Sequence, residues 1–324
     1  MNKLSPTQTI ILLALALDLA FGEPPNELHP VAWIGHLIGV LERRAPHGQP
    51  RRELIYGAGI ALAVLLTTML PALALEMLKN REQAPADSVK NHMSTDSVLG
   101  SWLSVLARAA LLKPAFAARA LFQAVAAVRR PLTAGDLGGA RVALRSLVSR
   151  DPSQLDTALI AAAAIESLAE NACDSFVAPL FYYSLLGLPG AWAYRAVNTL
   201  DAMIGYHGRY EYLGKIPARF DDLLNLVPAR LTALLIAAAA GLVGADPRQA
   251  WRALRRDHAQ TESPNAGYPM SAIAGALGIR LEKVEHYCLN GGRRAPQADD
   301  IVRAERVVAL ALAMAACLCI LVKR

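Results

Sequence analysis

Three acidic residues recur at a spacing that suits metal or phosphate chemistry. Glu166, Glu170 and Asp174 stand four residues apart in the segment ESLAENACD. On an α-helix this spacing places three carboxylates on one face, a turn apart. Like charges at that spacing repel, and apolar residues flank them, so a cation should compensate. Two candidates are Mg²⁺, which binds oxygen ligands and substrate phosphates, and arginine partners. A solvated acidic helix face is the simpler alternative.

A second polar cluster follows, in which acids, amides and basic residues alternate with apolar ones. Such a mixture is expected of a polar pocket at a membrane surface, facing the cytosol. A structural role is the alternative for the adjacent acids in ARFDD, which would then cap a helix or pair with the arginine before them. The members of this cluster are Asn198, Asp201, Tyr206, Arg219, Asp221, Asp222 and Arg230.

Two further segments contain candidate residues. Ser263 and Asn265 belong to SPNAGYP, which is dense in turn-forming residues and predicts a rigid loop, although turn chemistry does not decide whether it binds anything. Asp18 lies late in an apolar stretch, and an ionisable residue inside a membrane segment is a functional candidate. His29 follows it, and a lone histidine is more often a hydrogen-bonded structural residue. The chain lacks a GxxxxGK[ST] loop and a GxGxxG after a strand, so any nucleotide binds through another architecture.

The elements that position these residues are predicted to be packed helices. The chain has 324 residues, of which 54% are hydrophobic, 6% aromatic and 19% charged. The charged fraction lies below the roughly 25% of soluble domains. The mean hydropathy is +0.30. This composition excludes a disordered chain and a disulfide scaffold. It leaves an unusually apolar soluble enzyme or a membrane protein with polar loops.

Apolar runs favour the membrane protein. Residues 54–75 carry no charge and match the length of about 20 residues that a bilayer core requires. Residues 99–128 are apolar but contain Arg108, Lys113 and Arg119, which predicts an interfacial or protein-covered helix rather than a lipid-facing span. Shorter membrane segments are predicted at residues 10–17, read as a retained anchor, and at 231–245 and 307–322.

We therefore predict an all-α, polytopic membrane protein that forms a single domain over residues 1–324. A polar loop is expected at residues 79–98. The arginine-rich segments 129–150 and 248–256 belong on the cytoplasmic side by the positive-inside rule. The net charge of +6 does not indicate nucleic acid as a partner, because the basic residues form no tract interleaved with aromatic ones.

The ordered motifs resemble the CobD/CbiB family of cobalamin biosynthesis over nearly the whole chain. They are DLAFGEPPNELHPVAWIG, SRD, ESLAENACD, APLFYY, NTLDAMIGY, ARFDD with PAR, and SPNAGYP. The resemblance implies a multi-pass protein of the cell inner membrane with a cytoplasmic active site. It implies adenosylcobinamide-phosphate synthase activity, in which ATP drives amide ligation of (R)-1-aminopropan-2-ol, or its O-phosphate, to the free propionate carboxylate of adenosylcobyric acid. The implied partners are these substrates, the lipid bilayer and other late corrinoid-pathway membrane enzymes.

This chemistry assigns expected roles to the candidate residues, with ATP and Mg²⁺ as cofactors. An activated carboxylate needs Mg²⁺ to neutralise phosphate charge and basic groups to hold it. We expect Glu166, Glu170 and Asp174 to hold the metal, and Asp201, Asp221 and Asp222 to be catalytic, with Asp221 or Asp222 as the base. The expected substrate-binding residues are Asp18, His29, Arg150, Asp151, Asn171, Asn198, Tyr206, Arg219, Arg230, Ser263 and Asn265.

Two alternatives from other classes stay open. A membrane prenyltransferase-like enzyme also uses acidic helical motifs with Mg²⁺ to bind a diphosphate. A non-enzymatic regulatory protein is the other, because the wider family has a relative linked to signalling in β-lactamase induction. The acidic motifs retained in this chain speak against the regulatory alternative.

Overall fold

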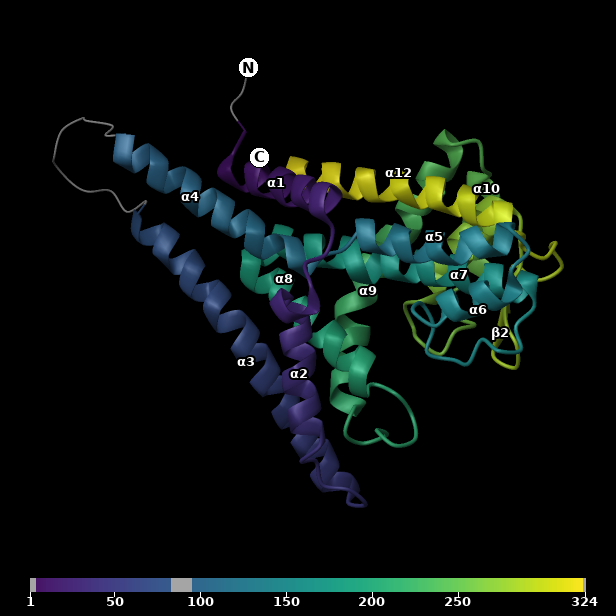
Figure 1. Ribbon diagram of the computed structural model, residues 1–324, viewed down its shortest axis with the longest axis horizontal. Coiled ribbons are helices and arrows are strands. Elements are labelled where there is room, and N and C mark those ends of the chain that lie inside the picture. The colour runs from purple at the N-terminus through teal and green to yellow at the C-terminus, as the bar shows by residue number, and fades with distance from the viewer. Residues whose placement is uncertain (1–3, 83–94, 323–324) are drawn as a thin grey trace. The chain divides into compact units, whose positions relative to one another are not determined.

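The computed structural model describes residues 4–82 and 95–322, and helices form almost all of the regular structure within these ranges (Figure 1). Five helical stretches among the described residues are long and apolar enough to cross a membrane. The all-α membrane fold predicted from the sequence is confirmed. The five stretches are Pro50–Met77, Trp102–Thr133, Thr157–Ile204, Lys215–Leu242 and Ala298–Val322.

Some of the predicted membrane segments coincide with these stretches and others do not. Residues 54–75 and 307–322 fall inside Pro50–Met77 and Ala298–Val322. The predicted segment 231–245 is too short by itself to cross a bilayer. The helix that contains most of it begins earlier, at Lys215, and includes charged residues. Residues 10–17 lie in a 16-residue helix, Pro6–Phe21, which is apolar but shorter than the five stretches. Its role as a retained anchor stays a prediction.

The chain divides into two compact units, each assembled from separate segments. The first comprises Met1–Ala117, Pro179–Asp221 and Cys319–Arg324, and the second Ala118–Ala178 and Asp222–Leu318. The single domain predicted over residues 1–324 stays a prediction, and each unit is described separately below.

The first unit contains the amino-terminal helices, whose starts are set by local capping. Ser5 and Gln8 form a capping box at the start of α1, in which each side chain accepts a hydrogen bond from the other's backbone N–H. His29 caps α2, because its Nδ1 accepts from the backbone N–H of Val31 at 3.1 Å. Helix α1 packs on α4, and α2 packs on α3. The elements are α1 (Pro6–Phe21), η1 (Asn26–Leu28), α2 (Pro30–Glu42), α3 (Pro50–Glu82), α4 (Thr95–Leu112), η2 (Lys113–Ala115) and nearly all of α8 (Ala178–Ile204).

The loop predicted at residues 79–98 lies mostly outside the described residues. Where the chain is described, α3 continues to Glu82 and α4 begins at Thr95. The first and last residues of the predicted loop are therefore helical.

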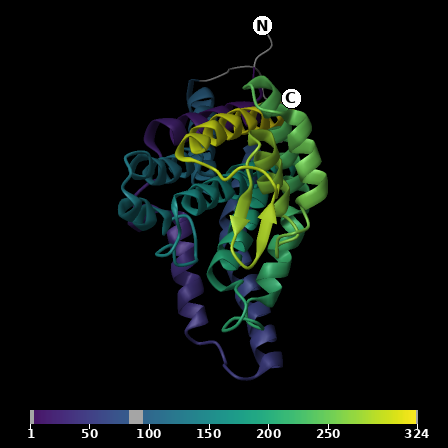
Figure 2. The same ribbon diagram turned by 90° about the vertical axis from the view of Figure 1, so that its right-hand side faces the viewer.

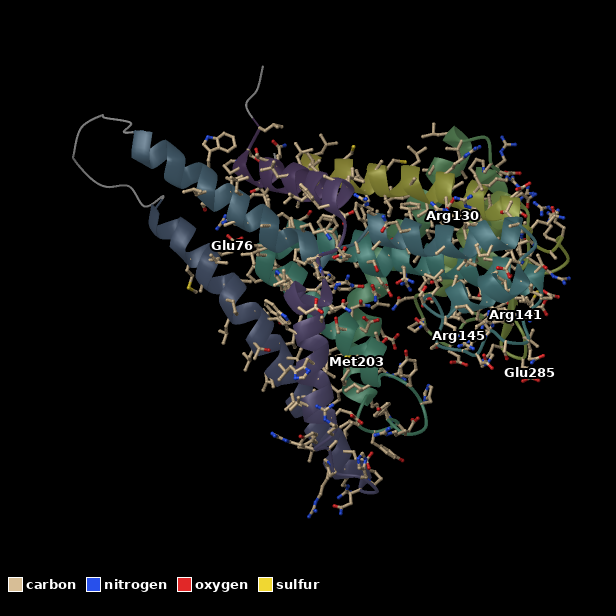
Figure 3. All side chains as sticks on the ribbon, in the orientation of Figure 1. Glu76, Arg130, Arg141, Arg145, Met203 and Glu285 are labelled. Atoms are coloured by element: carbon tan, nitrogen blue, oxygen red, sulfur yellow. The ribbon has the colours of Figure 1, made fainter. Side chains whose placement is uncertain are left out.

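Two of the three charged residues of the 99–128 segment are covered by protein. Arg108 and Lys113 are only 5% and 6% exposed. Arg108 Nη2 lies 3.2 Å from Oε2 of Glu76, whose place on α3 is labelled in Figure 3. Protein therefore covers these two residues, as predicted, and each cation is matched by an acid. The same segment nevertheless belongs to Trp102–Thr133, one of the five candidate membrane spans, so the prediction that it is not a span is not confirmed.

Helix α8 bends at Gly187, which interrupts its helical backbone. Gly187 has φ 69° and ψ −155°, a backbone conformation that is essentially restricted to glycine. A Cβ atom at this position would also lie 2.9 Å from Oε1 of Glu76. Pro189 follows two residues after the bend.

Gly187→Ala is expected to lower the free energy of unfolding by about 1–3 kcal/mol, because alanine must adopt a conformation reserved for glycine. Thermal unfolding in detergent, followed by circular dichroism, measures the effect. The matched control is Gly59→Ala on α3, where an added Cβ meets no atom within 4 Å. That change should be neutral or stabilising. Equal destabilisation of both variants would contradict the prediction.

The second unit contains the acidic motif and the one hairpin seen in the described residues (Figure 2). Helix α7 packs against α5, α6, α11 and strand β1. The strands are antiparallel, with Leu281 opposite Leu289. The elements are α5 (Arg119–Thr133), α6 (Leu137–Leu144), α7 (Thr157–Ala172), the π-helical turn η3 (Cys173–Val177), most of α9 (Lys215–Leu242), α10 (Pro247–Asp257), α11 (Gly267–Leu277), β1 (Leu281–Lys283), β2 (Tyr287–Leu289) and most of α12 (Ala298–Val322).

The hairpin is anchored by Asn290, a buried residue in the left-handed backbone region with φ 52°. Its side-chain amide donates to the carbonyls of Ala274 and Ile279, at 3.1 and 2.9 Å. Its backbone N–H donates to Asp257 at the end of α10. Hydrogen bonds with Arg256 and Asn290 hold the pKa of the Asp257 carboxyl below its usual value, although burial opposes this. The hairpin therefore has a defined position against α10 and α11.

Candidate functional site

The acidic motif begins at a buried carboxylate on α7. The Glu166 side chain is only 8% exposed, and its nearest ion-pair partner is Arg150 Nη2, 3.8 Å from Oε2. Its other oxygen, Oε1, has no hydrogen-bond partner within the described part of the chain. Burying a carboxylate oxygen without a partner is costly. A group that is cationic or donates a hydrogen bond would satisfy this oxygen, and ligand binding by Glu166 stays a prediction.

Two hairpin residues that sequence reasoning missed complete this group. Lys283 and Tyr287 both interact electrostatically with the Glu166 carboxylate. Burial raises the pKa of Tyr287, and the negative charges of Glu166 and Glu170 raise it further, so Tyr287 is a neutral phenol at physiological pH. The strands are three residues long, too short for a periodic pattern to signal them. We call Arg150, Glu166, Glu170, Lys283 and Tyr287 the Glu166 cluster.

The third acid of the motif does not continue the α-helix. Helix α7 ends at Ala172, and Cys173–Val177 forms a π-helical turn. Asp174 therefore lies in the π-helical turn and not in α7 itself, and the prediction that it shares one face with Glu166 and Glu170 stays a prediction. Such π-helical turns are rare and frequent at functional sites. A metal-binding role for Asp174 stays a prediction.

The residues present fit a magnesium ion that arrives with a phosphate substrate. Carboxylate oxygens are preferred Mg²⁺ ligands, and Glu166 and Glu170 are close enough to affect each other's charge. However, the described residues contain no group of three acidic, histidine or cysteine side chains arranged to hold a metal. Mg²⁺ is usually held by one or two carboxylates together with substrate phosphates. The donor set suits that mode of binding, and the assignment of these ligands stays a prediction.

Asn171 is engaged within the acidic motif itself. Its Nδ2 donates to the Ser167 carbonyl at 2.9 Å, and its Oδ1 accepts from the Ser175 hydroxyl at 3.4 Å. Ser167 in turn donates to the carbonyl of Leu147, in the segment before α7. These bonds order the end of α7 and the π-helical turn. Substrate binding by Asn171 stays a prediction.

Three predicted motifs of the second unit meet around Arg230. The Arg230 guanidinium lies 4.1 Å from the centroid of the Tyr268 ring, a cation–π geometry. Its Nη1 donates to Oδ1 of the buried Asn265 at 3.3 Å. Asn265 Nδ2 donates to the Asp222 carbonyl at 2.7 Å, and its backbone N–H donates to the Ser263 hydroxyl. Residues far apart in the sequence are thus brought together, with one guanidinium held at their centre.

Asp151 has a local structural role. Its carboxylate is exposed and accepts hydrogen bonds from the backbone N–H and the hydroxyl of Ser153, at 3.1 and 2.7 Å. The hydrogen bonds from Ser153 hold the pKa of Asp151 below its usual value. Asp151 therefore shapes the loop before α7, and a contact with substrate stays a prediction.

In the first unit, the amide of Asn198 links a cation and an acid. Arg195 Nη1 donates to Asn198 Oδ1 at 3.2 Å, and Asn198 Nδ2 donates to Asp221 Oδ1 at 3.4 Å. An ordered carboxylate that receives a hydrogen bond is a suitable proton acceptor when an amine approaches it. The catalytic role of Asp221 stays a prediction.

Three other predicted residues lie near the end of α8 and the start of α9. The Asp201 carbonyl accepts from Gly205 N–H at 2.7 Å, where α8 terminates. Tyr206 is 49% exposed. Arg219 is also exposed, on the first turns of α9. Their proposed roles in catalysis and substrate binding stay predictions.

A buried charge network in the first unit contains Asp18 and His29. Lys113 Nζ lies 3.3 Å from Asp18 Oδ1 and 2.6 Å from Glu23 Oε1, and Glu23 Oε2 lies 2.7 Å from His29 Nε2. Burial would raise the pKa of Glu23, but hydrogen bonds with His29 and Lys113 bring it below its usual value. Both His29 nitrogens are used within the protein, which matches the structural alternative. We call Asp18, Glu23, His29 and Lys113 the Lys113 network, and its contact with substrate stays a prediction.

Comparison with known proteins identifies the family. The model of the family described as CobD/Cbib protein matches residues 11–314. The chain is 43% identical over 281 residues to the cobalamin biosynthesis protein CobD of Dehalococcoides mccartyi, covering 86% of this chain and 85% of the relative. It is 42% identical to a CobD of Rhodobacter capsulatus, over 91% and 90% of the two chains. The CobD of Klebsiella pneumoniae is 39% identical, over 94% and 93%.

No solved structure matches the chain. The family model spans residues 11–314, and this range contains the Glu166 cluster, Arg230 and the Lys113 network. This protein therefore belongs to the CobD/Cbib family of cobalamin biosynthesis proteins.

Proposed function

We propose that this protein is an adenosylcobinamide-phosphate synthase. It would join (R)-1-aminopropan-2-ol, or its O-phosphate, to the free propionate carboxylate of adenosylcobyric acid with conversion of ATP to ADP. The family match over residues 11–314 is the observation that carries this proposal. The relatives are named cobalamin biosynthesis proteins, and the five candidate spans indicate a membrane protein.

The proposed reaction needs an activated carboxylate. An oxygen of the propionate attacks the γ-phosphorus of ATP, which releases ADP and leaves an acyl phosphate. The amine nitrogen then attacks the acyl carbon, the bond from carbon to the phosphate oxygen breaks, and inorganic phosphate leaves. The proton lost by the nitrogen passes to a base. Mg²⁺, when bound, neutralises phosphate charge during the first step.

The chain's residues support the binding and positioning parts of this reaction. Arg230, held by Tyr268 and Asn265, presents a guanidinium suited to a phosphate or a carboxylate. Glu166 offers a buried oxygen with no hydrogen-bond partner in the described chain. Asp221 is ordered by Asn198 and is our proposed base, with Asp222 as its neighbour and alternative.

A direct assay tests the proposal. Purified protein in lipid nanodiscs is mixed with adenosylcobyric acid, ATP and Mg²⁺, in separate arms with aminopropanol and with its phosphate. Mass spectrometry should detect the amide product together with one ADP for each amide formed, and the faster arm identifies the amine substrate.

Two outcomes would reverse the proposal. Consumption of a prenyl diphosphate, with no amide in either arm, would favour the prenyltransferase-like alternative. Failure of a well-expressed protein to complement a strain lacking cobinamide synthase, with no amide in either arm, would favour the regulatory one.

Tyr287→Phe is expected to reduce turnover roughly tenfold to a hundredfold, the range typical of residues that orient the groups around a metal or phosphate site. The phenol lies beside Glu166 and Glu170, and its removal leaves their orientation less defined. Steady-state rates of the amide-forming assay measure the effect. Tyr56→Phe is the matched control, because it also removes a hydrogen-bonded hydroxyl, on α3. Equal rates in the two variants would contradict an orienting role for Tyr287.

A further inference from the structure

The first unit contains a cavity of about 300 Å³ that the proposed reaction does not use. Helices α2, α3 and α8 and the end of α4 form its walls. None of the residues assigned to catalysis, substrate or metal lines it. Its lining includes Trp33, Leu37, Thr68, Ala72, Leu75 and Trp192.

The cavity wall is almost entirely apolar, and the four lining side chains that carry a hydrogen-bond donor use it within the protein. The hydroxyls of Thr67 and Thr68 donate to backbone carbonyls one turn earlier in α3, each at 3.0 Å. The indole nitrogens of Trp33 and Trp192 donate to backbone carbonyls at 2.9 and 3.2 Å. A polar ligand would lose its hydrogen bonds to water and gain few here. The wall therefore selects a hydrocarbon.

The surroundings of the cavity point to the bilayer as the source of that hydrocarbon. Its α3 wall belongs to Pro50–Met77, a candidate membrane span of which only 22% is buried. Leu62, Leu66 and Leu70 of the same helix are 59%, 47% and 57% exposed. Trp33, which lines the cavity, is 57% exposed, so the cavity is bordered by an exposed apolar side chain. In a membrane, acyl chains cover such a surface.

The size of the cavity distinguishes a lipid chain from a protein segment. About 300 Å³ lies at the lower end of small-ligand sites, roughly 300–1,000 Å³. A helix from a second copy, about 10 Å across with its side chains, does not fit such a hollow. We propose that one acyl chain of a membrane phospholipid occupies this cavity and stabilises the packing of α2, α3 and α8.

Photolabelling tests the proposal without using enzyme turnover. The full-length protein is placed in phosphatidylcholine nanodiscs in which a fraction of the lipid carries a diazirine on one acyl chain. Thr68→Trp fills the cavity, and Leu62→Trp makes the same kind of addition on the exposed face of α3. Labelling of peptides with Trp33 and Leu75 should be equal in wild type and Leu62→Trp. In Thr68→Trp the labelling should fall about tenfold, because the added indole occupies the cavity and weakens the binding of the acyl chain.

Lipid-dependent stability provides a second readout. Adding phosphatidylcholine to detergent-solubilised protein should raise Tm for wild type and Leu62→Trp but not for Thr68→Trp. If Thr68→Trp loses helical circular dichroism, the smaller filling variant Ala72→Met takes its place. Equal labelling in all variants, or cross-links that join two copies through these peptides, would overturn the proposal. A protein without synthase activity would still label, so this test is independent of the proposed function.

Discussion

Lys113→Met is expected to lower the free energy of unfolding by about 3–5 kcal/mol, the range for removing one partner of a buried ion pair. Lys113 is the cation shared by two acids, Asp18 and Glu23, at 3.3 and 2.6 Å. Asp18 is only 1% exposed, so water cannot replace the lost ammonium. Reversible unfolding in mixed micelles, followed by circular dichroism, measures the change.

Two further variants separate charge from packing. Lys215→Met removes an exposed lysine and should change stability by no more than about 0.5 kcal/mol. Adding Asp18→Asn and Glu23→Gln to Lys113→Met removes the uncompensated negative charges, and this triple variant should recover much of the lost stability. If the triple variant is as unstable as Lys113→Met alone, the loss arises from packing rather than charge.

The pH dependence of the same variants follows from Glu23. Its pKa in the folded protein lies below the ordinary value of 4.5, so the stability that it contributes is present above pH 4.5. That contribution is lost as the pH falls through the lower, folded pKa. In Lys113→Met the Glu23 carboxylate loses its hydrogen bond to the ammonium and is more easily protonated. The stability difference between wild type and Lys113→Met should therefore shrink as the solution becomes acidic.

The Lys113 network shows what the sequence could and could not predict. Asp18 and Lys113 both stood out as charges in apolar segments, and the need to cover them followed from the cost of exposing charge to lipid. Their pairing did not follow, because it depends on the packing of α1 against η2, whose sequences lie far apart. The helix content and the membrane class were predictable, because they follow from the amino-acid composition and from the length of the apolar segments.

The Glu166 cluster likewise contains features that could be predicted from the sequence and features that could not. The spacing of Glu166 and Glu170 identified one face of α7, but nothing in the residue pattern signals that the helix widens into a π-helical turn before Asp174. Tyr287 could not be identified from the sequence, because β2 is only three residues long. The position of β2 also depends on the hydrogen bonds by which Asn290 anchors the hairpin. Local periodicity predicts which residues share a helix face, whereas the residues that pack against that face depend on the tertiary structure.

Glu166→Gln and Glu170→Gln are each expected to reduce turnover by roughly a hundredfold to a thousandfold, the loss seen when one preorganised electrostatic group is removed from a reacting centre. Glutamine keeps the shape of the side chain, so the variant proteins should remain folded in the membrane. Initial rates of amide formation in nanodiscs measure the loss. Glu282→Gln is the matched control: it neutralises a partly exposed acid on β1, and its rate should equal that of wild type.

Magnesium titration then decides what Glu166 does. If it holds Mg²⁺ with the ATP phosphates, excess Mg²⁺ should partly restore the rate of Glu166→Gln, because a site with one fewer charged ligand binds the cation more weakly. If Glu166 instead positions Arg150, 3.8 Å away, the loss should be insensitive to Mg²⁺ and matched by Arg150→Gln. Wild-type rates in both Glu166→Gln and Glu170→Gln would show that the Glu166 cluster takes no part in the reaction. Arg230 with Asn265, and Asp221 with Asn198, would then be the remaining candidates for the catalytic centre.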